Sequence, residues 1–257
     1  MGVVNVTPDS FSGDGVYLRP DVAAVEARGM LDAGAAIVDI GGESTRPGSD
    51  GVSLEEELRR VEPVLAALRG EAISIDTAKA EVAQRALALG AELVNDVTAL
   101  RGDPELAGVV AAAGAYLCLM HMQGEPRTMQ ADPRYDDVVS EVKAFLEERL
   151  AFAVSQGVRE DHVCLDPGIG FGKTPEHNLE LVRRLDELIA LGRPVLVGFS
   201  RKSMLGKLMG DPNARVGTTA ASVGIGVAAF ERGATILRVH DVREHVEALR
   251  AAAAVLA

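Results

Sequence analysis

Eight short apolar runs recur along this chain of 257 residues, separated by stretches with the spacing of amphipathic helices. Apolar residues within a run are mostly consecutive, which is typical of strands buried on both faces of a parallel sheet. The runs are Gly2–Val6, Ala36–Ile40, Ala72–Asp76, Glu92–Val97, Tyr116–Met120, His162–Asp166, Pro194–Phe199 and Thr235–Val239. Repeated strand–helix units with right-handed crossovers predict an α/β fold, most simply a closed (β/α)8 TIM barrel. An open doubly wound sheet is the alternative.

The length of the chain suits one such barrel. A (β/α)8 domain typically needs about 250 residues, so a single domain over residues 1–257 accounts for the whole sequence. Two ordinary domains are the length-based alternative, but no linker or low-complexity tract divides the chain. Helix starts support the alternation: Ser53 and Glu56 form a capping-box pattern, and Thr174 followed by Pro175 is a typical N-cap and first helical position.

Charge and composition exclude several classes of function. With 26 Lys and Arg against 38 Asp and Glu, the formal net charge is −12. We therefore expect no nucleic-acid partner, because no broad basic surface is available. No apolar run reaches membrane-spanning length, so we expect no membrane association either. Cys118 and Cys164 both lie inside apolar runs, which predicts reduced core thiols in a cytoplasmic protein.

Polar or charged residues follow nearly every predicted strand. In a barrel, the active site is built from groups just past the carboxyl ends of the strands. The groups at these positions are Asn5, Glu43 to Arg46, Asp76, Asn95 with Asp96, His121, Asp166, Ser200 to Lys202, and Arg238 with His240. Any one of them could be only a turn former or helix cap, but the complete ring predicts an active site.

Three of these groups suit a flat heterocycle. Asp76, Asn95 and Asp166 offer two carboxylates and an amide from three different strands. A carboxylate can accept two parallel hydrogen bonds from an amidine-like edge, and an amide can match a mixed edge. The alternative is a pair of helix caps and a loop amide.

Four cationic or cation-capable groups suggest a bound phosphate or diphosphate. Arg238 and His240 alternate at the end of the last strand, so they project to the same side. Arg46 and Lys202 come from other loops, and loops after strands seven and eight commonly bind phosphate in this architecture. Surface ion pairs with the many acidic residues are the alternative.

Two loops carry glycine and aromatic residues. Asp166–Thr174 ends like a P-loop, but Pro167 stands where the motif requires glycine, so the match fails. Its glycines suggest close approach of the backbone to a planar ligand, with Phe171 as a wall. Asn5–Gly15 reads as a loop, and Phe11 within it suggests a mobile lid. We find neither a metal cluster with ligand spacing nor a nucleophile elbow.

The chain resembles the dihydropteroate synthase family along essentially its whole length. Matching segments occur in the family's order, beginning with Asn-Val-Thr-Pro-Asp-Ser-Phe-Ser and Gly-Glu-Ser-Thr-Arg-Pro-Gly. They are Asn5–Ser12, Gly42–Gly48, Ile75–Thr77, Val94–Asp96, Met120–Gly124, Asp166–Lys173, Ser200–Ser203 and Arg238–Asp241. One departure is the order Gly13-Asp14, where the family often reads Asp-Gly.

The resemblance implies an activity and a set of site residues. The family joins p-aminobenzoate to 7,8-dihydropterin-6-ylmethyl diphosphate, releasing diphosphate and forming 7,8-dihydropteroate. By resemblance, the pterin would be bound by Asp76, Asn95, Asp166 and Lys202, and the diphosphate by Asn5, Arg238 and His240, with Mg²⁺ near Asn5. Met120 is a further residue expected to bind substrate. The aminobenzoate pocket, where sulfonamides also bind, would comprise Thr45, Arg46, Pro47, Phe171 and Ser200, closed by Phe11. The groups expected to act in catalysis are Asp76, Lys202, Arg238 and His240.

Two other functions stay open at this point. A pterin-dependent methyltransferase domain, which passes a methyl group from methyltetrahydrofolate, would share the carboxylates and amide but has no use for a cationic diphosphate site. A catalytically silent pterin-binding homologue is disfavoured by the intact set of polar strand ends. The family is usually dimeric, so the resemblance also implies a homodimer.

Overall fold

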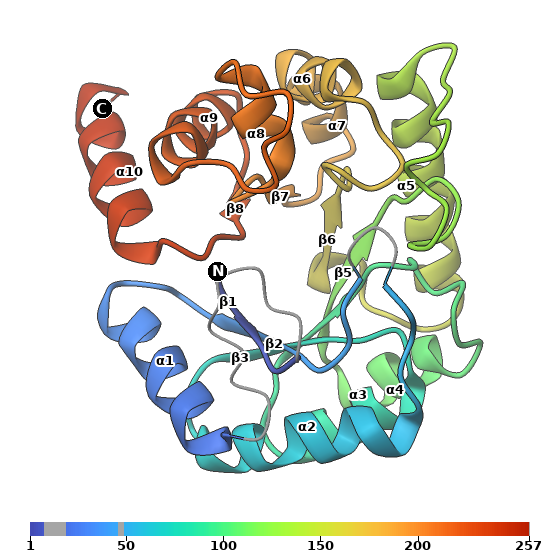
Figure 1. Ribbon diagram of the computed structural model, residues 1–257. Helices are drawn as coiled ribbons and strands as arrows, with labels where there is room; N and C mark the ends of the chain where they lie inside the picture. The colour runs from blue at the N-terminus through green and yellow to red at the C-terminus, as the bar shows by residue number, and fades with distance from the viewer. Residues whose placement is uncertain (8–18, 46–48, 257) are drawn as a thin grey trace.

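The computed structural model describes residues 1–7, 19–45 and 49–256. Strands and helices alternate through these ranges, and helices surround a central ring of strands (Figure 1). The strands are β1 Gly2–Asn5, β2 Val38–Gly41, β3 Ile73–Asp76, β4 Leu93–Asp96, β5 Tyr116–Met120, β6 Val163–Asp166, β7 Leu196–Val197 and β8 Ile236–Leu237. The helices are α1 Pro20–Asp32, α2 Leu54–Ala67, α3 Ala80–Ala88, α4 Leu106–Ala113, α5 Val138–Ser155, α6 Pro175–Arg183, α7 Leu185–Ile189, α8 Ser203–Leu208, α9 Thr219–Glu231 and α10 Val242–Leu256, with a 3-10 turn at Glu160–His162. None of the helices in the described ranges is both long and apolar enough to span a bilayer.

The strands close into a barrel. β1 to β6 pair in parallel and in sequence order, and β7 pairs with β8. Two isolated parallel bridges, Leu165 with Val195 and Gly2 with Val239, join these two groups on both sides. The N–H of Val3 also donates to the carbonyl oxygen of Val239 at 3.0 Å. The predicted (β/α)8 barrel is therefore confirmed, and the open sheet is excluded.

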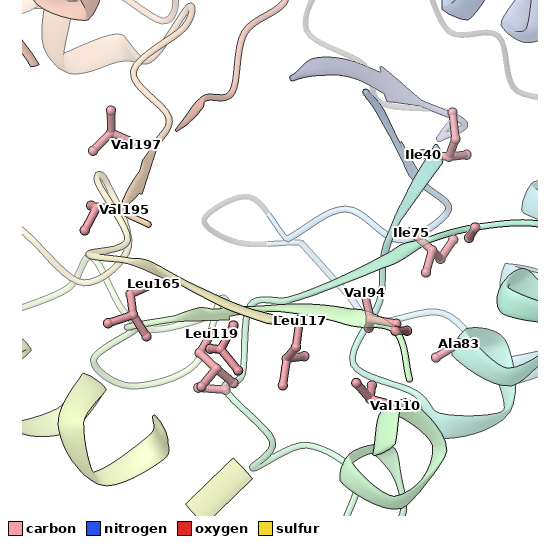
Figure 2. Close-up of a cluster of buried hydrophobic side chains, with 14 of the residues drawn as sticks. Ile40, Ile75, Ala83, Val94, Val110, Leu117, Leu119, Leu165, Val195 and Val197 are labelled. Atoms are coloured by element: carbon pink, nitrogen blue, oxygen red, sulfur yellow. The ribbon is translucent and has the colours of Figure 1, made fainter. Parts of the chain in front are cut away.

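Most of the apolar core lies between the strands and the outer helices. Ile75 of β3 and Val94 of β4 belong to the same buried cluster as Ala83 of α3 and Val110 of α4 (Figure 2). Burying these β-branched and small side chains excludes water from both components of each strand–helix unit. This layer holds the strands rigidly and leaves the barrel interior to other side chains.

The barrel interior has an apolar floor beneath polar residues. Leu93, Cys118, Cys164 and Leu196 form a small buried cluster of their own. Cys118 and Cys164 are in register on β5 and β6, and both are buried free thiols, as the sequence predicts. These side chains fill part of the barrel interior below the polar residues at the carboxyl ends of the strands.

Capping residues set the helix starts. Ser53 Oγ accepts the N–H of Glu56 at 3.3 Å, which is one half of the predicted capping box, while the Glu56 carboxylate pairs with Arg59 and Arg60. Thr174 Oγ1 accepts the N–H of His177 at 3.2 Å, and His177 Nδ1 accepts the N–H of Thr174 at 3.3 Å. Pro175 occupies the first turn of α6. These caps fix where the loops of the barrel rim end and the helices begin.

Candidate functional site

Side chains from neighbouring strands meet at the carboxyl rim of the barrel. Parallel pairing aligns Asn5 with Gly41, Gly41 with Asp76, and Asp76 with Asn95. A Cβ on Gly41 would lie 3.6 Å from Asn5 Oδ1 and 3.6 Å from Asp76 Cβ, so these two side chains share its face of the sheet. Asp166 ends β6 at the same rim. The structure therefore brings together the carboxylates and amides that were predicted from the strand ends.

Arg238 pairs with two interior carboxylates. Its Nε donates to Asp39 Oδ2 at 2.7 Å, and its Nη2 donates to Asp76 Oδ2 at 2.9 Å. Asn95 Nδ2 donates to the same Asp39 oxygen at 2.9 Å. The predicted anion ligand is therefore also the counter-ion of two interior carboxylates, which differs from the alternative of a solvent-exposed surface pair.

Sequence reasoning did not select Asp39. It lies in the middle of β2, is fully buried, and interrupts an otherwise apolar strand. A carboxylate in this position is costly to bury unless cations or N–H groups compensate it. The interrupted apolar run was the signal that could have identified it, because a lone Asp inside a buried strand needs a partner.

Burial makes the carboxyl group of Asp76 a weaker acid than an exposed aspartic acid. It raises the pKa of Asp76 to about 8; Arg238 opposes this rise and the negative charge of Asp39 adds to it. The ion pair with Arg238 offsets part of the burial that raises this pKa. A cation forming beside Asp76 would favour the ionised carboxylate, so this group can respond to positive charge on a ligand.

One carboxylate oxygen of Asp166 accepts a hydrogen bond from the chain, and the other is available to a ligand. Its Oδ1 accepts the N–H of Gly168 at 2.7 Å. Burial raises the pKa of Asp166, and the Gly168 N–H and the charge of Lys202 oppose that rise. The second oxygen accepts no hydrogen bond within the described ranges, which leaves it free for a donor on a ligand.

Lys202 lies beside Asp166 and above an aromatic ring. Its Nζ donates to the carbonyl oxygen of Ile169 and lies 4.7 Å from the centroid of Phe171. Burial lowers the pKa of Lys202 to about 8, although Asp166 opposes this effect. Phe171 also packs against a buried cluster that contains Met120. An apolar wall and a cation thus adjoin the carboxylate, as a planar polar ligand requires.

The glycines of the loop after β6 serve a different purpose from the one predicted. Gly168 has φ +68°, and a Cβ there would overlap the carbonyl oxygen of His121; a Cβ on Gly172 would overlap the carbonyl oxygen of Gln123. The close approach is therefore between two segments of this chain's own backbone. The interpretation that these glycines make room for a planar ligand is corrected for Gly168 and Gly172.

Lys173 holds this loop from within. Its buried Nζ lies 2.8 Å from His121 Nδ1 and donates to the carbonyl oxygens of Gly168 and Phe171 at 3.0 Å each. Burial, together with the charge of Lys173, lowers the pKa of His121 to about 2, so the ring is neutral, and burial also lowers the pKa of Lys173 well below its usual value. His121, another strand-end group, thus supports the loop rather than facing a ligand.

We predict that Gly168→Ala destabilises the fold strongly, by about 2–4 kcal/mol, because a Cβ adds a backbone clash to a left-handed conformation. Gly192→Ala is the matched control. Gly192 has φ +73° and open space around its Cβ position, so only about 1 kcal/mol should be lost there. Urea denaturation of both variants measures the difference, and equal losses would contradict the tight packing of the loop.

Ser200 joins the last two loops of the barrel. Its Oγ accepts the backbone N–H of His240 at 3.0 Å and contacts His240 Nδ1 at 3.0 Å. Next to it, Arg201 adopts φ +59° and donates through Nη2 to Asp241 Oδ1 at 2.7 Å. These contacts tie the segment that carries Lys202 to the segment that carries Arg238 and His240.

Two other strand-end groups are structural. Asp96 accepts the N–H groups of Thr98 and Leu100 at 2.8 and 2.6 Å, so it shapes the turn after β4. Glu43 pairs with Lys79, which also pairs with the buried Glu57. For both residues the turn or ion-pair alternative explains the position.

The predicted aminobenzoate pocket is described only in part. Thr45, Phe171 and Ser200 lie within the described ranges, with Thr45 half-buried and Ser200 buried. Arg46, Pro47 and the lid residue Phe11 lie outside the described residues. No contact is therefore assigned to those three.

The donor chemistry at Asn5 suits Mg²⁺ only together with a ligand. Asn5 ends β1 at the rim and supplies an amide oxygen, a hard donor. Within the described ranges, no group of three or more His, Cys, Asp or Glu side chains could hold a metal ion. Mg²⁺ commonly keeps several waters and takes substrate phosphate oxygens besides one or two protein ligands. The residues fit an ion that arrives with a diphosphate.

Comparison with known proteins places these features in a family. A family model described as a pterin binding enzyme matches residues 1–240. Dihydropteroate synthase of Neisseria meningitidis serogroup C is 48% identical over 98% of this chain and 90% of that protein. The structure of Yersinia pestis dihydropteroate synthase in a sulfonamide drug complex is 44% identical, with a TM-score of 0.94 over 100% of this chain and 93% of that one. The Thermus thermophilus enzyme in complex with 4-aminobenzoate is 49% identical, with a TM-score of 0.85 over 99% of this chain and 93% of that one.

Proposed function

Because the chain belongs to the dihydropteroate synthase family of pterin-binding enzymes, we propose that it condenses 7,8-dihydropterin-6-ylmethyl diphosphate with p-aminobenzoate. The products are 7,8-dihydropteroate and diphosphate, which makes the protein a transferase of folate biosynthesis. One observation carries this assignment: a single rim holds hydrogen-bond acceptors from β3, β4 and β6 together with Lys202 and Arg238, which follow β7 and β8. We also propose that residues 1–257 act as one pterin-binding domain.

The pterin ring would lie across the acceptors of the rim. The free oxygen of Asp166 suits the N–H edge of the ring, and Asn95 and Asp76 suit its other polar atoms. Lys202 donates to carbonyl-like acceptors, and Met120 adds an apolar contact from β5. Four of these residues lie at the ends of strands and Lys202 is the N-cap of α8, so all five are carried by regular elements of the barrel.

The diphosphate would bind beside the pterin, at Asn5, Arg238 and His240. Arg238 keeps Nη1 free of hydrogen bonds to the described residues, although its other nitrogens are paired. Bound Mg²⁺ would neutralise charge on the diphosphate, with Asn5 as a protein ligand. Arg238 and His240 would orient the leaving group toward solvent.

The aminobenzoate would occupy the apolar side of the rim. Thr45, Arg46 and Pro47 follow β2 in the sequence, while Phe171 and Ser200 lie in the loops after β6 and β7. The proposal also includes Phe11 as a lid residue and sulfonamides as ligands of the same pocket. The ring of Phe171 supplies a face on which an aromatic substrate can pack.

The proposed reaction separates two charges. The bond between the methylene carbon and the diphosphate oxygen breaks, and its electron pair leaves with the diphosphate. The cation on the pterin is stabilised by Asp76, whose raised pKa falls as positive charge develops beside it. The amine nitrogen of p-aminobenzoate then forms the new bond to the methylene carbon and releases a proton. The arylamine is nucleophilic as the free base, so no general base is required before attack.

The decisive experiment is incubation with the pterin diphosphate, Mg²⁺ and labelled p-aminobenzoate. We expect labelled dihydropteroate. Methyl transfer from methyltetrahydrofolate to a corrinoid, with no condensation, would favour the methyltransferase alternative. Pterin binding without any turnover would identify a silent homologue.

We propose a homodimer that uses the surface between α8 and α9. Leu208, Met209 and Val216 are exposed there by 51%, 62% and 38%. Met209→Glu should convert the dimer to a monomer in sedimentation velocity, because a charge would be buried at the interface. Val25→Glu, at an exposed position of α1, is the control and should leave the assembly unchanged. A monomeric parent protein would refute the proposal.

We further propose a cytoplasmic location. Cys118 and Cys164 are free thiols in adjacent strand positions, and a reducing compartment would keep them so. Fractionation of cells that express the chain tests this.

A further inference from the structure

Asp39 is a fully buried carboxylate that lies beneath the site. It lies on β2 two residues before Gly41, so it faces the same side of the sheet one layer deeper than the rim. Its neighbours Val38 and Ile40 point the other way, into the apolar layer behind the strands. A carboxylate inside the barrel therefore lies directly beneath the groups that would bind the pterin.

Asp39 directs two rim residues through a single oxygen. Oδ2 accepts from Arg238 Nε at 2.7 Å and from Asn95 Nδ2 at 2.9 Å. Its Oδ1 is buried and has no hydrogen-bond partner among the described residues. Both hydrogen bonds that the Asp39 side chain accepts thus come from rim residues, and neither comes from the strand that carries it.

The first consequence concerns the Asn95 amide. An amide presents a carbonyl oxygen on one side and an NH₂ group on the other, and the two can exchange by rotation. Donation of Nδ2 to the Asp39 carboxylate fixes the orientation of the Asn95 amide, with its NH₂ group toward Asp39 and its oxygen on the other side. Oδ1, which accepts no hydrogen bond from the described residues, is then the atom available to a ligand. As a carbonyl oxygen, it can bind only a hydrogen-bond donor of that ligand.

The second consequence concerns the Arg238 guanidinium. Asp39 holds Nε and Asp76 holds Nη2, so two contacts fix the plane of the group. A planar fork held at two points loses little further freedom when its third nitrogen binds an anion. Nη1 is the nitrogen left for a ligand.

We propose that Asp39 is a positioning residue that fixes the orientation of the Asn95 amide and of the plane of the Arg238 guanidinium group. The site then presents an acceptor at Asn95 Oδ1 and a donor at Arg238 Nη1 before substrate arrives. This inference rests on the proposed function, since it concerns the same pterin diphosphate. It predicts that Asp39 contributes to pterin recognition although it lies below the rim.

Three variants test the proposal by calorimetry with 7,8-dihydropterin and by steady-state kinetics. Asp39→Leu replaces the carboxylate with an apolar side chain and removes the acceptor, and pterin affinity should fall about 10- to 100-fold, as for loss of charge-assisted hydrogen bonds. Asp39→Asn retains an oxygen that can accept both bonds, so it should stay within about fivefold of the parent. The KM for p-aminobenzoate should change little in either variant. Urea midpoints establish that each variant is folded.

Ser74→Ala is the matched control. Ser74 pairs in register with Asp39, is fully buried, and its Oγ has no hydrogen-bond partner among the described residues. Its removal should leave pterin affinity within about twofold, as expected for a side chain that holds no rim group. Parent-like affinity in folded Asp39→Leu, or equal losses in Asp39→Asn and Asp39→Leu, would overturn the positioning role. If the parent binds no pterin and forms no dihydropteroate, the proposed function itself fails, which is a distinguishable result.

Discussion

Arg238→Ala is expected to lower kcat/KM for the pterin diphosphate by about 10²- to 10³-fold, the usual effect of removing a group that stabilises developing charge. The departing diphosphate gains negative charge as its bond to carbon breaks. A cation beside it therefore stabilises the transition state more than the bound substrate. Binding of a pterin that lacks the diphosphate should weaken much less.

The ion pairs of Arg238 add a stability effect that must be separated from catalysis. Without the guanidinium, Asp39 and Asp76 lose their shared counter-ion. We expect a loss of about 1–3 kcal/mol, less than for a fully buried pair, because the Arg238 side chain is 22% exposed. Urea denaturation measures this loss in the free energy of unfolding independently of turnover.

Inhibition by free diphosphate isolates the anion-binding role. The parent protein should be inhibited, and Arg238→Ala should be inhibited more weakly. Arg232→Ala, at an exposed arginine at the end of α9, is the control and should behave like the parent. Equal inhibition of the parent and Arg238→Ala would remove Arg238 from the site, and absence of inhibition in every protein would count against the synthase assignment.

The barrel could be predicted because its signal is repeated. Each apolar run needs only to be recognised as a strand, and the alternation with helices then restricts the topology. The lengths of the strands were not predictable in the same way. β7 and β8 each comprise two residues, and closure of the barrel depends on bridges at Val195 and Val239 just outside them. Apolar periodicity marks a buried segment, whereas ladder pairing depends on the neighbouring strand.

The site was predictable where chemistry and position coincide. Asp76, Asn95 and Asp166 were found because they follow strands, and the structure places all three at the rim. The same rule also selected Asp96, which is a turn-forming residue, because sequence position does not distinguish a cap from a ligand. It missed Asp39, whose importance depends on partners that are distant in sequence.

The Gly-rich loop shows the same limit. Composition indicates that something approaches its backbone closely, but not what. The structure identifies the partners as the carbonyl groups of His121 and Gln123. Lys173, which resembles the lysine of a P-loop, instead donates to the loop's own carbonyl groups. Only the tertiary contact decides between a ligand and another part of the chain.

Asp166→Asn is expected to reduce pterin affinity by about 2–4 kcal/mol, as for a charge-assisted pair left unmatched. The Gly168 N–H at 2.7 Å requires an acceptor on one side of the group. The amide oxygen of the variant will therefore turn toward Gly168, and its NH₂ group will face the ligand. The NH₂ group, a donor, then faces the N–H edge of the ring, which is also a donor. The variant therefore loses the hydrogen bond to the carboxylate and places two donors against each other.

The variant should nevertheless fold. Burial raises the pKa of Asp166 above its unfolded value, which is about 3.9 for Asp. The unfolded chain therefore releases its proton at a lower pH, and the carboxyl group lowers the free energy of unfolding as pH rises above that value. Asn does not titrate, so Asp166→Asn escapes this loss at neutral pH. Calorimetric titration with 7,8-dihydropterin measures the affinity, with the exposed Asp161→Asn as the control. Unchanged affinity in folded Asp166→Asn would exclude Asp166 from the pterin site.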